Sequence, residues 1–81
     1  MALKAYILIN TQIGRTSQVA ETLRQMPEVK RLDIIMGPYD IIAEVETEDH
    51  TALSEVVMKR LQSIESIQHT MTCPVVQVEG D

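Results

Sequence analysis

Aromatic residues are almost absent from this sequence, which contains no phenylalanine, no tryptophan and only two tyrosines, Tyr6 and Tyr39. The hydrophobic core must therefore consist of Ile, Val, Leu and Met, stabilised by buried apolar area at about 25 cal/mol per Å². A chain of 81 residues buries only roughly 60–65% of its unfolded surface. We therefore expect one domain that gains stability by burying a further apolar face in an oligomer.

Cysteine is also scarce. The single residue Cys73 excludes an internal disulfide and is typical of proteins in a reducing compartment. The N-terminus lacks the apolar stretch of a signal peptide, and no apolar run approaches the length of a membrane span. The sequence therefore predicts a soluble, cytoplasmic protein that does not associate with a membrane.

Positive charge is the third shortage, with seven Lys and Arg against twelve Asp and Glu and a net charge of −5. Direct nucleic-acid binding needs clustered basic side chains that contact phosphates. The basic residues are scattered here, and only Lys30-Arg31 and Lys59-Arg60 are adjacent. We therefore expect no direct contact with nucleic acid.

The apolar pattern predicts the order strand, helix, strand, twice over. The four expected strands have alternating apolar residues and lie at about 3–11, 29–36, 41–47 and 67–79. The first helix follows Gly14, with Thr16 or Ser17 as its cap, and Asp49 caps the second. Their apolar stripes are Val19, Leu23 and Met26 in the first helix, and Leu53, Val57, Leu61 and Ile64 in the second.

A doubled strand-helix-strand unit of this length packs as a ferredoxin-like βαββαβ plait, an α+β fold. Its four-stranded antiparallel sheet has both helices on one face. Pro74 lies inside the last expected strand, which predicts an edge position or a bulge there. The first three strands carry apolar residues on both sides, among them Tyr6, Leu8, Ile35 and Ile42. We therefore expect the uncovered face of the sheet to form a dimer with the same face of a second copy.

The most informative short motif is Gly37-Pro38-Tyr39-Asp40, which lies between two expected strands. Pro38 presets φ for a turn, and Gly37 tolerates backbone conformations closed to other residues. One interpretation is an ordinary hairpin with a solvent-facing tyrosine. The other is a ligand loop, in which backbone N–H groups are free and Asp40 accepts a hydrogen bond from an ammonium group.

A second polar set lies in the last expected strand, where Thr70 and Thr72 share one face. Paired hydroxyls can hold a carboxylate or an amine, although threonine is also simply common in strands. His50, His69 and Cys73 do not form a recognisable metal-binding set. The acidic residues Glu44, Glu46, Glu48 and Asp49 are more typical of an exposed edge than of acid–base catalysis. No nucleophile–base pair or phosphate loop is present, so the sequence predicts neither an enzyme nor a cofactor.

The chain resembles the effector-binding (RAM) domain of the leucine-responsive/asparagine-responsive (Lrp/AsnC) transcriptional regulators. The similarity rests on segments 5–11 and 26–29, on Gly37-Pro38-Tyr39-Asp40 with the following Ile41-Ile42-Ala43, and on Thr70-Met71-Thr72. Full-length members of this family carry a helix-turn-helix before this domain. Because Met1 directly precedes the first expected strand, we expect residues 1–81 to be a single stand-alone domain.

This resemblance implies the same plait, dimers formed through the sheets, and rings of such dimers. It implies an amino-acid effector held between dimers, near the hairpin turn and the last strand. The implied ligand-binding residues are Gly37, Tyr39, Asp40, Thr70 and Thr72. The implied partners are further copies of the chain and a full-length regulator of the same family.

Two functional hypotheses follow. The first is an amino-acid sensor that acts through oligomer assembly. The second is a small cofactor-free enzyme, similar to the monooxygenases that share this plait and its sheet-to-sheet dimer. The second hypothesis needs a roomy cleft lined with aromatic or histidine side chains, and the chain has two Tyr and two His in all. The scarcity of these residues favours the sensor.

Overall fold

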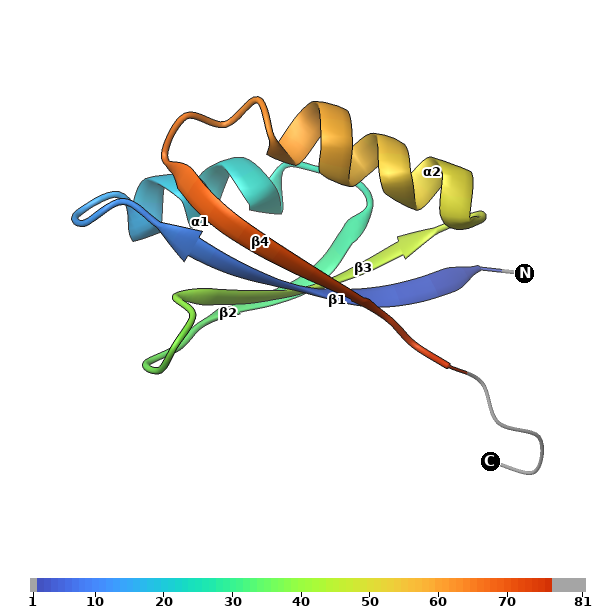
Figure 1. Cartoon of the computed structure of the whole chain (residues 1–81), viewed down its shortest axis with the longest axis horizontal. Helices are drawn as coiled ribbons and strands as arrows, with labels where there is room; N and C mark the ends of the chain where they lie inside the picture. Colours follow the sequence, from blue (N-terminus) through green and yellow to red (C-terminus); the bar gives the residue numbers. More distant parts are fainter. Residues whose placement is uncertain (1, 77–81) are drawn as a thin grey trace.

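The computed structural model describes residues 2–76 and confirms the predicted plait. Its antiparallel sheet has the order β2-β3-β1-β4. The strands are β1 (Leu3–Thr11), β2 (Val29–Ile34), β3 (Ile41–Thr47) and β4 (Ile67–Pro74). Helix α1 (Thr16–Arg24) and helix α2 (His50–Glu55), which continues as η1 (Val56–Leu61), lie on one face of this sheet (Figure 1). The opposite face is left uncovered.

Alternate residues of the two central strands form the floor of the core. The fully buried members on the sheet are Ala5, Ile7, Ile9, Ile41, Ala43 and Val45. The predicted stripe of α1 packs on them, since Val19, Leu23 and Met26 are all buried. The core is therefore aliphatic throughout, as the scarcity of aromatic residues requires.

The helix caps follow the prediction at one helix and not at the other. Asp49 caps α2, because its Oδ1 accepts a hydrogen bond from the backbone N–H of Ala52 at 2.8 Å. The cap predicted for α1 is wrong, since its cap position is Arg15 and no side chain bonds the first turn. The hydroxyl of Thr16 instead contacts the hydroxyl of Thr11 at 2.7 Å.

The second helix changes its winding after Glu55. The segment η1 is a π-helix, in which the N–H of Gln62 donates to the carbonyl of Val57, five residues earlier. Val56 and Leu61 are buried, and Val57 is partly buried against the same core. The five-residue step from Val56 to Leu61 matches the wider turn of a π-helix, so a stripe predicted with 3.6 residues per turn includes Val57 but omits Val56.

Strand β4 lies at the edge of the sheet, as Pro74 predicts. Pro74 is its last residue, although the N–H of Val75 still donates to the carbonyl of Lys4 at 2.8 Å. The pairing of β1 with β4 is irregular between Asn10 and Thr11. The end of the expected strand, residues 77–79, lies outside the described part of the chain.

The uncovered face of the sheet is mixed in character. Its apolar residues are Leu8, Ile42, Tyr6 (36% exposed) and Met71 (48% exposed). Charged residues surround them, because Arg31 pairs with Glu44 in the register of β2 and β3. The expectation that the second strand is apolar on both sides is wrong. Leu32 and Ile34 align with the buried row of β3, but Arg31 and Asp33 occupy the other side, and Ile35 lies beyond the end of β2.

The connection between β2 and β3 spans residues 35–40, so β2 ends two residues earlier than predicted. Gly37 in this turn does not use a positive φ, so the conformational reason proposed for it is wrong. A Cβ atom added to Gly37 would meet nothing within 4 Å. Gly14, between β1 and α1, has φ 81° and does need glycine.

These two glycines should respond differently to the same substitution. Gly14→Ala forces a side chain into the left-handed region, and should lower the free energy of unfolding by about 1–2 kcal/mol. Gly37→Ala should be neutral, or raise it by up to about 1 kcal/mol, because it restricts the unfolded chain without strain. Urea unfolding of both variants measures the difference. Equal destabilisation by the two substitutions would contradict the backbone conformations of Gly14 and Gly37.

Candidate functional site

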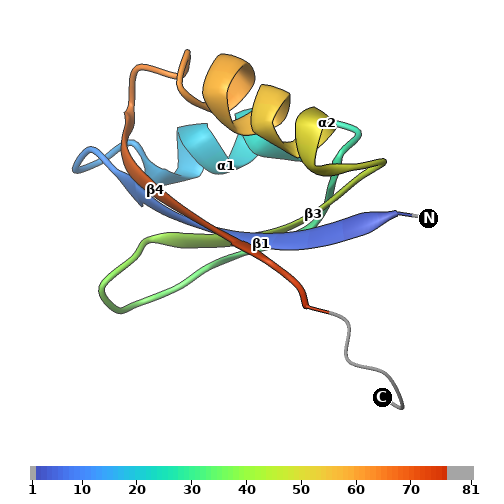
Figure 2. The ribbon, with the colours of Figure 1, turned by 45° about the vertical axis from the view of Figure 1, so that its right-hand side comes forward.

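Backbone hydrogen bonds hold the β2–β3 turn at its first and last residues, Ile35 and Asp40. The N–H of Ile35 donates to the carbonyl of Asp40 at 2.8 Å, and the N–H of Asp40 donates to the carbonyl of Ile9 at 2.9 Å. The turn therefore lies beside the end of β1. Both views place it at the same end of the molecule as the β1–α1 connection (Figures 1 and 2).

The carboxylate of Asp40 joins three elements. Its Oδ2 accepts from the backbone N–H of Thr11 at 2.8 Å and from the hydroxyl of Thr11 at 3.3 Å. The same hydroxyl contacts that of Thr16 at the start of α1. Sequence patterns did not predict this structural role. The other oxygen, Oδ1, makes no hydrogen bond within residues 2–76, so it can still receive a donor from outside.

The middle of the turn offers donors. Neither the N–H of Gly37 nor that of Tyr39 has an acceptor in the described chain. The carbonyl of Pro38 accepts from the side-chain amide of Asn10 at 2.8 Å. The hydroxyl of Tyr39 donates to Met71 Sδ at 3.9 Å, which brings the ring towards the uncovered face of the sheet. Gly37, Tyr39 and Asp40 thus combine two free N–H donors with one free carboxylate oxygen.

Thr70 and Thr72 lie elsewhere on the sheet. In register they align with Ile9 and Ile7, so both are on the helix-covered side of β4. The hydroxyl of Thr70 accepts from the amide of Gln62 at 3.4 Å. Strand β1 separates β4 from β3, which is about two strand spacings or ~9.5 Å. Within one copy, the structure does not bring these threonines together with the turn.

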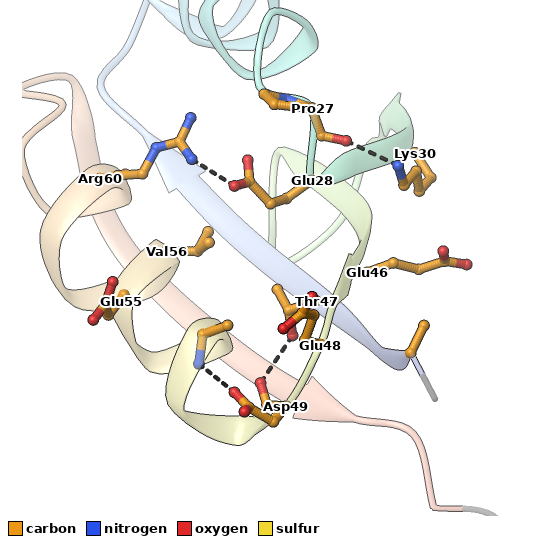
Figure 3. Close-up of a pocket in the computed structure, with 12 residues that line it drawn as sticks. Pro27, Glu28, Lys30, Glu46, Thr47, Glu48, Asp49, Glu55, Val56 and Arg60 are labelled. Carbon is orange, nitrogen blue, oxygen red and sulfur yellow. Dashed lines mark hydrogen bonds and ion pairs between the residues drawn. The ribbon is translucent and has the colours of Figure 1, made fainter.

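A hollow of about 850 Å³ lies away from both predicted sites. It lies between the start of β2, the end of β3 and α2 (Figure 3). Its charged lining is Glu28, Lys30, Glu46, Glu48, Asp49, Glu55 and Arg60. Arg60 bonds Glu28 Oε2 at 2.7 Å, while Glu28 Oε1 is buried without a partner. Glu28 belongs to the junction 26–29 that carries the family resemblance, and Glu46, Glu48 and Asp49 belong to the acidic set considered for acid–base catalysis.

The two histidines and the cysteine considered for a metal site lie on different elements or strand positions. His69 aligns with Asn10, and Cys73 aligns with Tyr6, both on the uncovered face. His50 begins α2. No group of three metal-binding side chains occurs among residues 2–76. No helix in the same range is long and apolar enough to cross a membrane.

Comparison with known proteins gives a consistent result. The family model of the Lrp/AsnC ligand binding domain matches residues 4–79. An uncharacterised HTH-type transcriptional regulator of Pyrococcus abyssi is 31% identical over 75 residues, which cover 93% of this chain and 48% of that protein. The chain spans about half the length of the curated relatives it matches.

Two solved structures extend this result to the fold. FFRP-DM1 is 34% identical with a TM-score of 0.89, and the match covers 91% of this chain and 99% of that one. AsnC of E. coli is 26% identical with a TM-score of 0.88, and the match covers 95% of this chain and 52% of that one. The similarity thus reaches both single-domain chains and longer regulators.

Proposed function

The chain belongs to the Lrp/AsnC ligand-binding domain family, and from this membership we propose that it binds an amino acid at the β2–β3 turn. A regulatory role in effector binding follows from the family itself, since the curated relatives are transcriptional regulators. The proposed finer role is that of a sensor, in which the bound amino acid controls how copies of the chain assemble.

The observation that carries this proposal is the set of unpaired polar groups on the turn. A zwitterionic amino acid needs an acceptor for its ammonium group and donors for its carboxylate. Asp40 Oδ1 supplies the acceptor, and the N–H groups of Gly37 and Tyr39 supply the donors. The open space around Gly37 supports this assignment, because the glycine leaves the backbone accessible without serving the turn's conformation.

Thr70 and Thr72 enter the proposal as residues of a neighbouring copy. Tyr39 reaches β4 at Met71 over the uncovered face, whereas Thr70 and Thr72 lie on the helix-covered side, so one small amino acid does not contact both in the same chain. A second copy that presents its β4 to the turn completes the site. A ligand bound across this contact stabilises the assembly by RT ln(1 + [L]/Kd), which is roughly 2.7 kcal/mol at about 100 Kd. That free energy is sufficient to change an assembly state.

The uncovered face of the sheet supports a homodimer beneath this assembly. Leu8, Ile42 and Met71 give it an apolar centre, and the charges of Arg31 and Glu44 lie beside that centre. An apolar centre with a polar rim is the usual anatomy of a specific interface. We propose that rings of such dimers, or mixed assemblies with a full-length relative, carry the signal.

The enzyme alternative receives no support from the geometry. It needs a cleft lined with aromatic or histidine side chains, whereas the 850 Å³ hollow contains neither residue type and most of its charged residues are acidic. The similar protein of Pyrococcus abyssi is a transcriptional regulator by name.

Asp40→Asn tests the ligand site. The asparagine carbonyl keeps the hydrogen bonds from Thr11, but its amide replaces the free carboxylate oxygen and repels an ammonium group. A thermal-shift screen of the standard amino acids identifies the ligand, with sedimentation to measure assembly. Calorimetry should then show binding weakened roughly ten- to hundred-fold, the cost of a charge-assisted contact. Full-strength binding to this variant would show that Asp40 in the turn does not bind the ligand.

Thr11→Val is the matched control for this experiment. It removes a hydroxyl bond to the same carboxylate, and should lower stability by about 1 kcal/mol. It leaves Asp40 Oδ1 unchanged, so amino-acid affinity should be retained. If Thr11→Val weakens binding as much as Asp40→Asn, the effect of Asp40 is structural.

Ile42→Lys tests the dimer. A desolvated, unpaired ammonium group on the centre of the uncovered face is costly, so sedimentation should show monomer or aggregate. Ile13→Lys is the control, because Ile13 is fully exposed on the β1–α1 connection, away from this face. A dimer that tolerates Ile42→Lys as well as Ile13→Lys would refute the sheet-to-sheet arrangement.

A further inference from the structure

One side chain of β1, that of Asn10, forms a hydrogen bond with the backbone of the proposed ligand-binding turn. Asn10 is partly buried near the end of β1, and its Nδ2 donates to the carbonyl of Pro38 at 2.8 Å. The bond spans 28 positions of sequence, and it joins the central strand to the middle of the turn. The backbone hydrogen bonds of Ile35 and Asp40 hold only the two ends of the turn. Asn10 is thus the side chain that fixes the turn between them.

This contact fixes the direction of a neighbouring donor. The peptide between Pro38 and Tyr39 is trans, since the described chain contains no cis peptide bond. In a planar trans peptide the C=O and N–H bonds point in opposite directions. Because Asn10 holds the carbonyl of Pro38, the N–H of Tyr39 must point away from Asn10. That N–H has no acceptor in the described chain.

Two further features restrict the same peptide. The ring of Pro38 limits φ on one side of it. On the other side, the Tyr39 hydroxyl contacts Met71 Sδ. The Tyr39 N–H is therefore oriented before any ligand arrives, and binding does not carry the entropy loss of ordering the turn.

We infer that Asn10 is a positioning residue for ligand recognition: it orients the Tyr39 N–H towards the carboxylate of the bound amino acid. This inference rests on the proposed function, because it specifies how one donor of that site is held. Asn10 itself does not touch the ligand. Its removal should weaken recognition of the carboxylate and leave recognition of the ammonium group at Asp40 unchanged.

Asn10→Val tests this inference, because valine suits a strand and cannot donate a hydrogen bond. Gln68→Val is the control, since Gln68 is an amide on β4 with no side-chain hydrogen bond in the described chain. The probes are the amino acid found by the thermal-shift screen and its amino alcohol, in which CH2OH replaces the carboxylate. Calorimetry gives the ratio of the two affinities for each protein.

The wild-type protein and Gln68→Val should prefer the amino acid to its alcohol. In Asn10→Val this preference should fall roughly three- to tenfold, because the variant removes the neutral hydrogen bond between Asn10 and the carbonyl of Pro38 that orients the donor. Affinity for the alcohol should stay constant. In ¹⁵N-labelled, ligand-free protein the Tyr39 amide resonance should move towards its unstructured position in Asn10→Val only.

Three results would overturn the inference. An unchanged preference in Asn10→Val, with wild-type binding intact, rejects the role of Asn10 alone. An equal loss of affinity for acid and alcohol, together with a lower Tm, shows a merely structural tether. If the wild-type protein binds no amino acid, the proposed function fails and this inference fails with it.

Discussion

The hydrogen bonds at the end of β1 are the contacts on which the proposed site depends. At this point the ladder between β1 and β3 ends, and side-chain bonds continue it: Asp40 accepts from the N–H of Thr11, and Asn10 donates to Pro38. These two contacts hold the β2–β3 turn against the central strand from either side. They also occupy the inward-facing polar groups of the turn, so that the groups left unpaired are those available to a ligand.

The composition of the core explains why such a small domain is suited to assembly. Without large aromatic side chains, the core is a single aliphatic layer between two helices and one face of the sheet. The other face keeps an apolar centre at Leu8 and Ile42 that two helices cannot cover. A second copy can cover this centre without any additional helix or strand. The same chain then presents β4 and the turn outwards, where a site shared between copies can form.

The sequence predicted features that depend on local patterns. Alternation of apolar residues predicted the strands, and the carboxylate of Asp49 predicted a cap that the structure confirms. The predictions failed where a contact between two elements decides the outcome: Thr16 bonds Thr11 instead of capping α1, because β1 ends beside the helix. The π-turn at Val56 is likewise invisible to a pattern with 3.6 residues per turn. Spacing along the chain also cannot show that Thr70 lies across β1 from Asp40, since this depends on strand order.

We assign the amino acid to the β2–β3 turn and not to the acid-lined hollow beside Glu28. A ¹H–¹⁵N NMR titration with the amino acid selected by screening separates these surfaces most directly. We expect the largest shifts at the free amides of Gly37 and Tyr39, with smaller shifts at Thr11. Shifts concentrated instead around the hollow, at Glu28 and Arg60, would contradict the assignment of the ligand to the turn.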